Sequence, residues 1–129
     1  MPDKSCELFI DRTLYVIGGS TEVLRFRVLS PVTKEPVELR NAKSIEWLLT
    51  TYSVKSRYAV LTKSLARNEI SILENPVTKI GNILQITINN EDTKDLQGAF
   101  IHQTVITDSR DMRFVPFQGL LVIGKGIKS

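Results

Sequence analysis

The sequence predicts an all-β sandwich, in which two antiparallel sheets pack face to face. Three observations support this prediction. Apolar and polar residues alternate with a period of two, turn-forming residues return about every 8–12 residues, and helical periodicity is almost absent. Alternation of this kind turns one face of each strand toward a core and the other toward water, as in antiparallel sheets that are packed on one side.

The alternation is clearest in segments 24–28, 45–49 and 84–88, where each apolar residue is followed by a more polar one. Leu48 breaks the polar side of the second segment. We expect the apolar residues of these segments, together with one aromatic residue later in the chain, to form the core. The predicted core residues are Leu24, Phe26, Val28, Ile45, Trp47, Leu49, Leu84, Ile86, Ile88 and Phe100.

Seven further segments have strand composition, and turn chemistry separates them. They are residues 6–10, 14–17, 59–65, 69–73, 99–107, 113–117 and 120–123. Pro116 cannot donate to a ladder, so its segment is predicted to be an edge or bulged strand. Gly18 and Gly19 suit a turn with positive φ, and segments 30–36 and 108–111 are predicted to be loops.

Helical structure is expected only near residues 91–96, as one short turn. Asp92 or Thr93 would cap its start and Gly98 would end it. The 129 residues fit one domain. We expect its core to run from about residue 6 to residue 123, with 124–129 as a flexible tail.

The composition excludes several classes of protein. It is 42% hydrophobic and 24% charged, which is ordinary for a globular domain and argues against disorder. A net charge of +3 without a dense basic stripe argues against nucleic-acid binding. No apolar run approaches the roughly 20 residues of a membrane span. The single Cys6 rules out an internal disulfide and fits a reducing cytoplasm.

No motif for catalysis, a cofactor or a metal stands out, so we predict that the protein is not an enzyme. His102 is the only histidine and has no companion ligands for zinc, so a structural role is expected. A Ser-His-Asp triad would need a geometry that sequence alone does not reveal. Glu91, Asp92 and Asp95 lie close together but lack the calcium-loop pattern, and capping explains them more simply.

One segment alternates aromatic and basic residues. Tyr52, Arg57 and Tyr58 fall between two predicted strands, and Tyr and Arg are favoured anchors of protein interfaces. Contact with a nucleic-acid backbone is another interpretation, and a solvated loop is the simplest.

A wider pattern carries a family resemblance. It consists of segments 24–28, 36–39 and 42–47, followed by Glu91-Asp-Thr93, Leu96, Gly98 and Phe100. This pattern resembles the immunoglobulin-like domains of tailed-phage structural proteins, in particular the N-terminal domain of phage baseplate upper proteins. Trp47 resembles the buried tryptophan of the third sandwich strand, and Phe100 stands at the position of the corner tyrosine. His102 stands where an antibody domain has its second cysteine.

The resemblance implies an immunoglobulin-like sandwich that serves as a virion component made in the host bacterial cytoplasm. Such a tail, baseplate or head-decorating adaptor would bind other phage structural proteins, and we expect it to form a homo-oligomer. The alternative is a ligand-binding sandwich, such as a carbohydrate-binding domain, which would need exposed aromatic residues on one sheet face.

Overall fold

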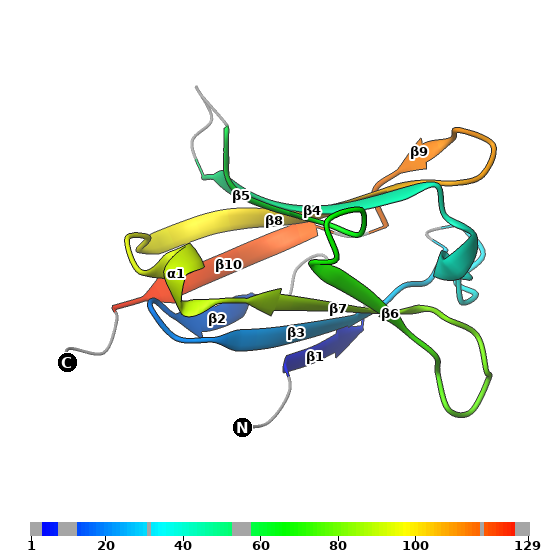
Figure 1. The fold of residues 1–129 in the computed structure, drawn as a ribbon, viewed down its shortest axis with the longest axis horizontal. Coiled ribbons are helices and arrows are strands. Elements are labelled where there is room, and N and C mark those ends of the chain that lie inside the picture. Colours follow the sequence, from blue (N-terminus) through cyan, green and yellow to red (C-terminus); the bar gives the residue numbers. More distant parts are fainter. Residues whose placement is uncertain (1–3, 8–12, 31, 53–57, 117, 126–129) are drawn as a thin grey trace.

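The computed structural model describes residues 4–7, 13–30, 32–52, 58–116 and 118–125. In this part of the chain, ten strands, one 3₁₀ turn and one short helix follow each other in the order shown in Figure 1. The elements are β1 (Lys4–Glu7), β2 (Leu14–Ile17), β3 (Glu22–Arg27), η1 (Leu39–Asn41), β4 (Ser44–Thr51), β5 (Ala59–Ser64), β6 (Ile70–Leu73), β7 (Ile83–Ile88), α1 (Asn90–Thr93), β8 (Gly98–Thr107), β9 (Arg113–Phe114) and β10 (Gln118–Gly124).

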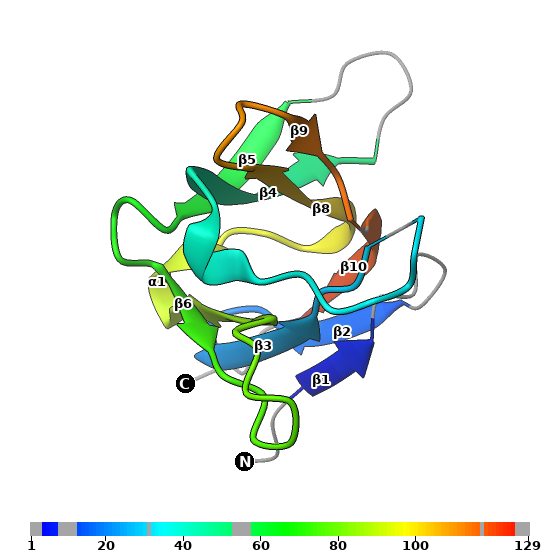
Figure 2. The same ribbon diagram turned by 90° about the vertical axis from the view of Figure 1, so that its right-hand side faces the viewer.

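The strands form two layers, which confirms the predicted all-β sandwich. The smaller sheet has the order β1-β3-β7-β6, and the larger has the order β2-β10-β8-β4-β5 with β9 paired to β8. Seen end-on in Figure 2, the larger sheet forms the upper layer and continues through β10 to β2, beside the smaller sheet. The layers enclose one core.

The strand order is that of an immunoglobulin domain. Such domains place strands A, B, E and D in one sheet and C, F and G in the other, to which variable-type domains add C′. Here β3, β7 and β6 correspond to B, E and D, whereas β4, β5, β8 and β10 correspond to C, C′, F and G. The chain before β3 contributes one strand to each sheet, β1 to the smaller and β2 to the larger.

Pairing departs from the antiparallel pattern at two outer strands. β1 runs parallel to β3, and β2 runs parallel to β10. Tight hairpins join antiparallel strands only. The parallel neighbours are accordingly far apart in sequence, and β2 and β10 come from opposite ends of the chain.

The ten predicted core residues are all buried, with exposed fractions between 0% and 8%. Trp47 is fully buried at 0%, as the resemblance implied. Leu48, which interrupts the alternation, lies on the outer face of β4 and is half-buried there. Its neighbours Trp47 and Leu49 both point inward.

The short helix lies where a helical turn was expected, but the predicted caps were wrong. α1 begins one residue earlier, and its N-cap is Asn89 instead of Asp92 or Thr93. The Asp92 carboxylate, in the third helical position, accepts a hydrogen bond from the Asn89 backbone N–H at 2.8 Å. Acidic side chains stabilise the first turn in this way because its N–H groups have no helical partner.

Smaller differences concern strand ends. The predicted strand 113–117 is reduced to two residues, and Pro116 lies beyond it. Most of the predicted strand 6–10 and of the predicted tail 124–129 lies outside the described residues. Of the described helices, none has the length and apolar character needed to cross a membrane.

Candidate protein-binding surfaces

His102 belongs to the core. Its side chain on β8 is 3% exposed and stacks on Phe26 of β3, with ring centroids 5.6 Å apart and ring planes 22° apart. The Trp47 ring of β4 also lies against the His102 ring, with the two ring centroids 6.3 Å apart. Burial lowers the pKa of His102 to about 4, so the imidazole is neutral in the folded protein near pH 7.

The acidic residues Glu91 and Asp92 form ion pairs at the corner between β7 and β8. Asp92 accepts a hydrogen bond from the Lys63 ammonium at 2.6 Å, and the Lys63 side chain is only 4% exposed. Glu91 pairs with Lys94 at 2.9 Å on the surface. Within the described residues, no three His, Cys, Asp or Glu side chains gather as metal ligands would.

The two tyrosines predicted as part of an interface follow β4 and precede β5. Tyr52 is 60% exposed and Tyr58 is 63% exposed. The Thr51 N–H donates to the Tyr58 carbonyl at 3.2 Å and links the two chain segments there. Arg57 lies outside the described residues, so its part in this surface stays a prediction.

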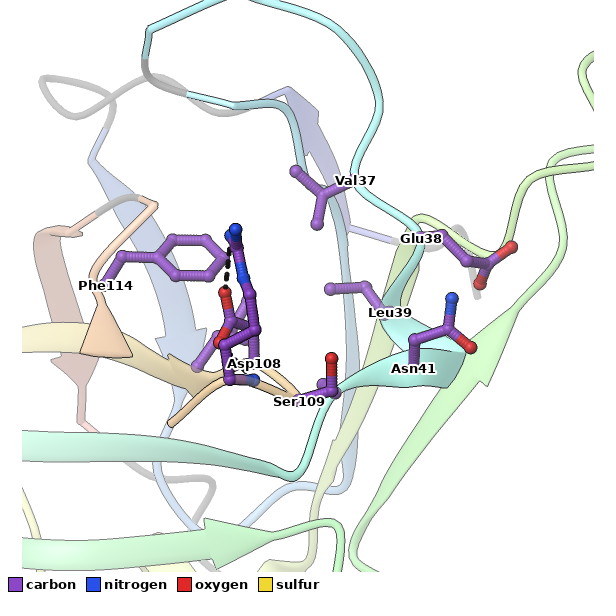
Figure 3. A pocket seen from close by; sticks show the side chains of 10 residues that line it. Val37, Glu38, Leu39, Asn41, Asp108, Ser109 and Phe114 are labelled. Atoms are coloured by element: carbon purple, nitrogen blue, oxygen red, sulfur yellow. Dashed lines mark hydrogen bonds and ion pairs between the residues drawn. The ribbon is translucent and has the colours of Figure 1, made fainter. Parts of the chain in front are cut away.

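A cleft that sequence reasoning missed opens at the opposite end of the sandwich. Its volume is about 250 Å³, and it lies between the segment around η1 and the turn that joins β8 to β9. Leu39 and Ile106, both buried, contribute to its apolar lining. Figure 3 shows Phe114 on one side of the opening, Val37 and Leu39 on the other, and Asp108 between them.

Asp108 organises the turn beside this cleft. One of its carboxylate oxygens accepts hydrogen bonds from the backbone N–H groups of Arg110 at 2.9 Å and Met112 at 3.0 Å. The other accepts from the Arg110 guanidinium at 3.2 Å. These bonds, the Met112 backbone bond foremost, hold the pKa of Asp108 below its usual range. The Asp108 carboxylate therefore stabilises the conformation of this turn.

A second hollow of about 300 Å³ adjoins the cleft and shares Val37, Asp108, Arg110 and Phe114 with it. Exposed apolar side chains rim it: Val32 is 86% exposed and Met112 is 61% exposed. We call the cleft, the hollow and this rim the loop-end surface. Large apolar side chains held in water beside an apolar recess are typical of binding sites.

Glu38 braces one wall of the loop-end surface. Its carboxylate accepts hydrogen bonds from the Arg40 guanidinium at 2.6 and 2.9 Å, from the Arg40 backbone N–H at 3.0 Å and from the Gly81 N–H at 3.1 Å. These bonds lower the pKa of Glu38 to about 2, with the Arg40 side chain as the largest cause. They tie η1 to the loop between β6 and β7.

The loop-end surface could not be found by motif because its walls are about seventy residues apart in the sequence. The one available signal was Val32, an apolar residue inside a predicted polar loop. No protein-family model matches the sequence, and no curated protein matches it either.

Proposed function

We propose that the protein is a non-enzymatic structural subunit of a bacteriophage or prophage particle, acting through protein–protein assembly. A tail, baseplate or head-decorating adaptor is the form that the sequence resemblance favours. In this proposal the chain is made in the host bacterial cytoplasm and functions in the virion.

One observation carries the proposal, namely the loop-end surface. Val32 and Met112 are exposed next to an apolar recess, beside which the Asp108 carboxylate and the Arg110 guanidinium are bonded to each other. The Asp108 carboxylate is hydrogen-bonded within its own turn. The recess therefore presents mainly apolar surface to a binding partner. An apolar side chain from a neighbouring structural protein fits such a recess better than a charged substrate would.

The immunoglobulin-like pattern supports the same proposal. Trp47 and Phe100 are buried at the positions that the resemblance assigned to them, and His102 stacks in the interior. Because these side chains are buried in the core, contacts with other proteins would use the loop ends and the outer sheet faces, as in many sandwich domains.

Two matched variants test the proposal. Val32 and Val77 are both valines in loops, 86% and 87% exposed, but only Val32 lines the loop-end surface. We expect Val32→Glu to reduce the amount of the protein in gradient-purified phage particles at least tenfold, and Val77→Glu to leave it unchanged, by quantitative mass spectrometry. Absence of the wild-type chain from the particles would overturn the proposal.

A ligand-binding sandwich is the second candidate, and exposed tyrosines favour it. Tyr15 on β2 and Tyr52 at the end of β4 are 65% and 60% exposed. Aromatic faces of this kind can stack on sugar rings. Trp47 is fully buried and cannot serve in that role. Binding on a glycan array that Tyr52→Ala abolishes would favour this candidate over assembly.

A further inference from the structure

The outer face of the larger sheet is made almost entirely of uncharged side chains. Alternation along β2, β10, β8 and β4 points every second residue away from the core. Register places Leu120 opposite Ile101, and Val122 opposite Tyr15. We define the large-sheet face by six apolar residues: Tyr15, Leu48, Ile101, Val105, Leu120 and Val122.

Uncharged polar residues lie at one end of this face and within it. Ser44 and Thr107 pair at the far end, and Gln103 lies between Leu48 and Gln118 in the register. A mixture of apolar and uncharged polar side chains is common in protein interfaces. The outer face of the smaller sheet differs, because Arg25 and Arg27 alternate along β3 and Gln85 of β7 accepts a hydrogen bond from Arg25 at 2.7 Å.

The charge of the large-sheet face does not oppose contact with a second copy. Among the described outward positions of β2, β10, β8, β4 and β5, Glu46 is the one formal charge. On β9, Arg113 lies opposite the outward-pointing Thr107 and adds one positive charge at the same end. The face therefore has no net charge, and a second identical face can approach it without the cost of opposing like charges.

The size of the face allows a small symmetric contact. Five strands about 4.8 Å apart span about 24 Å, and six residues of strand span about 20 Å, so the projected area is about 500 Å². Accessible area exceeds projected area because side chains stand out from the sheet. A contact over the whole face thus falls among the small interfaces, below the roughly 800 Å² per partner of standard ones.

We infer that a second copy of this chain packs on the large-sheet face, sheet against sheet, to form a dimer. This inference rests on the proposed assembly function and names one of its partners. Leu48, Ile101 and Leu120 lie at the centre of the contact, on adjacent strands. The loop-end surface lies at the end of the sandwich and stays open in the dimer, available for a different protein.

Sedimentation equilibrium of the purified chain tests the inference. We expect a dimer for the wild type, and at least about a hundredfold rise in the dimer Kd for Ile101→Lys, because a two-fold contact buries the new charge twice. The matched control is Thr87→Lys, which puts the same side chain on the outer face of β7 in the smaller sheet. It should dimerise like the wild type.

A second variant, Leu48→Thr, guards against misfolding of Ile101→Lys because threonine suits an exposed strand position. We expect it to weaken the dimer with an unchanged circular dichroism spectrum. A wild type that stays monomeric at about 100 μM, or a dimer that survives both face variants, overturns the inference. So does a monomer whose face binds a glycan or an unrelated protein. Particle incorporation with Val32→Glu and Val77→Glu is scored separately, so either proposal can fail alone.

Discussion

Phe26 and His102 stack across the interior, with ring centroids 5.6 Å apart, and join the two sheets at the centre of the sandwich. They lie on β3 and β8, the strands that correspond to B and F. In antibody domains a disulfide joins these strands beside the buried tryptophan. Here two stacked rings occupy that place, and the Trp47 and His102 ring centroids are 6.3 Å apart. Ring packing therefore links the two sheets without a disulfide bond.

This stack makes stability depend on pH. The pKa of His102 is about 4 in the folded protein and near 6.5 in the unfolded chain. Between these values the unfolded chain binds a proton that the folded protein does not, so the free energy of unfolding falls as pH falls from 6.5 to 4. The full loss is about 3 kcal/mol, at 1.36 kcal/mol per pKa unit.

Urea unfolding at a series of pH values measures this loss. His102→Phe keeps an aromatic ring in the stack and should lose the slope between pH 6.5 and 4. A wild type whose slope in that window equals that of the variant would contradict the burial of His102.

The second prediction concerns the ion pair between Lys63 and Asp92. Asp92→Asn leaves the buried Lys63 ammonium without a counter-charge, and we expect a loss of about 3–5 kcal/mol of unfolding free energy. Lys63→Met removes the charge that must be buried and should cost less. The exposed pair of Lys94 with Glu91 provides the control, since Lys94→Met should leave the free energy of unfolding nearly unchanged. Equal losses for the two variants of the buried pair would show that Lys63 is solvated.

The third prediction concerns the Glu38 brace at the loop-end surface. Glu38→Gln removes the charge that holds the Arg40 side chain and the Gly81 N–H. We expect the Gly81 amide to exchange with solvent roughly tenfold faster, measured by NMR. Glu74→Gln is the control, because Glu74 accepts one longer bond from the Arg40 guanidinium, at 3.3 Å. Unchanged exchange in Glu38→Gln would mean that the backbone alone holds this wall.

The same brace has a pH dependence with a definite sign. Because the pKa of Glu38 is about 2 in the fold and near 4.5 otherwise, its stabilising effect is complete above pH 4.5 and is lost as pH falls toward 2. Exchange of the Gly81 amide in the wild type, corrected for intrinsic rates, should therefore accelerate only below about pH 4.5.

Much of the fold could be predicted because alternation reports burial directly. Leu24, Ile45 and Ile86 stand in period-two patterns, and each is buried in the sandwich. Leu48 was visible as an irregularity, but its meaning depends on neighbours from β8 and β5 that only the register supplies. The parallel pairing of β2 with β10 joins opposite ends of the chain, a relationship without a local signal.

The corner between β7 and β8 shows the same limit. Phe100 has no hydroxyl for the corner hydrogen bond that a tyrosine makes, and sequence alone could not say what holds the corner instead. In the structure, Lys63 of β5 reaches Asp92, and the Gly19 N–H donates to the Thr93 hydroxyl at 3.0 Å. These partners lie 29 and 74 residues apart, so their contact follows from tertiary packing.

A cryo-electron microscopy reconstruction of phage particles purified from cells that carry the gene tests the central claim most directly. The account predicts density for this sandwich in the particle, with the loop-end surface against a different protein and the large-sheet face against a second copy. Particles that lack the sandwich, while the chain is abundant in the same cells, would contradict the account.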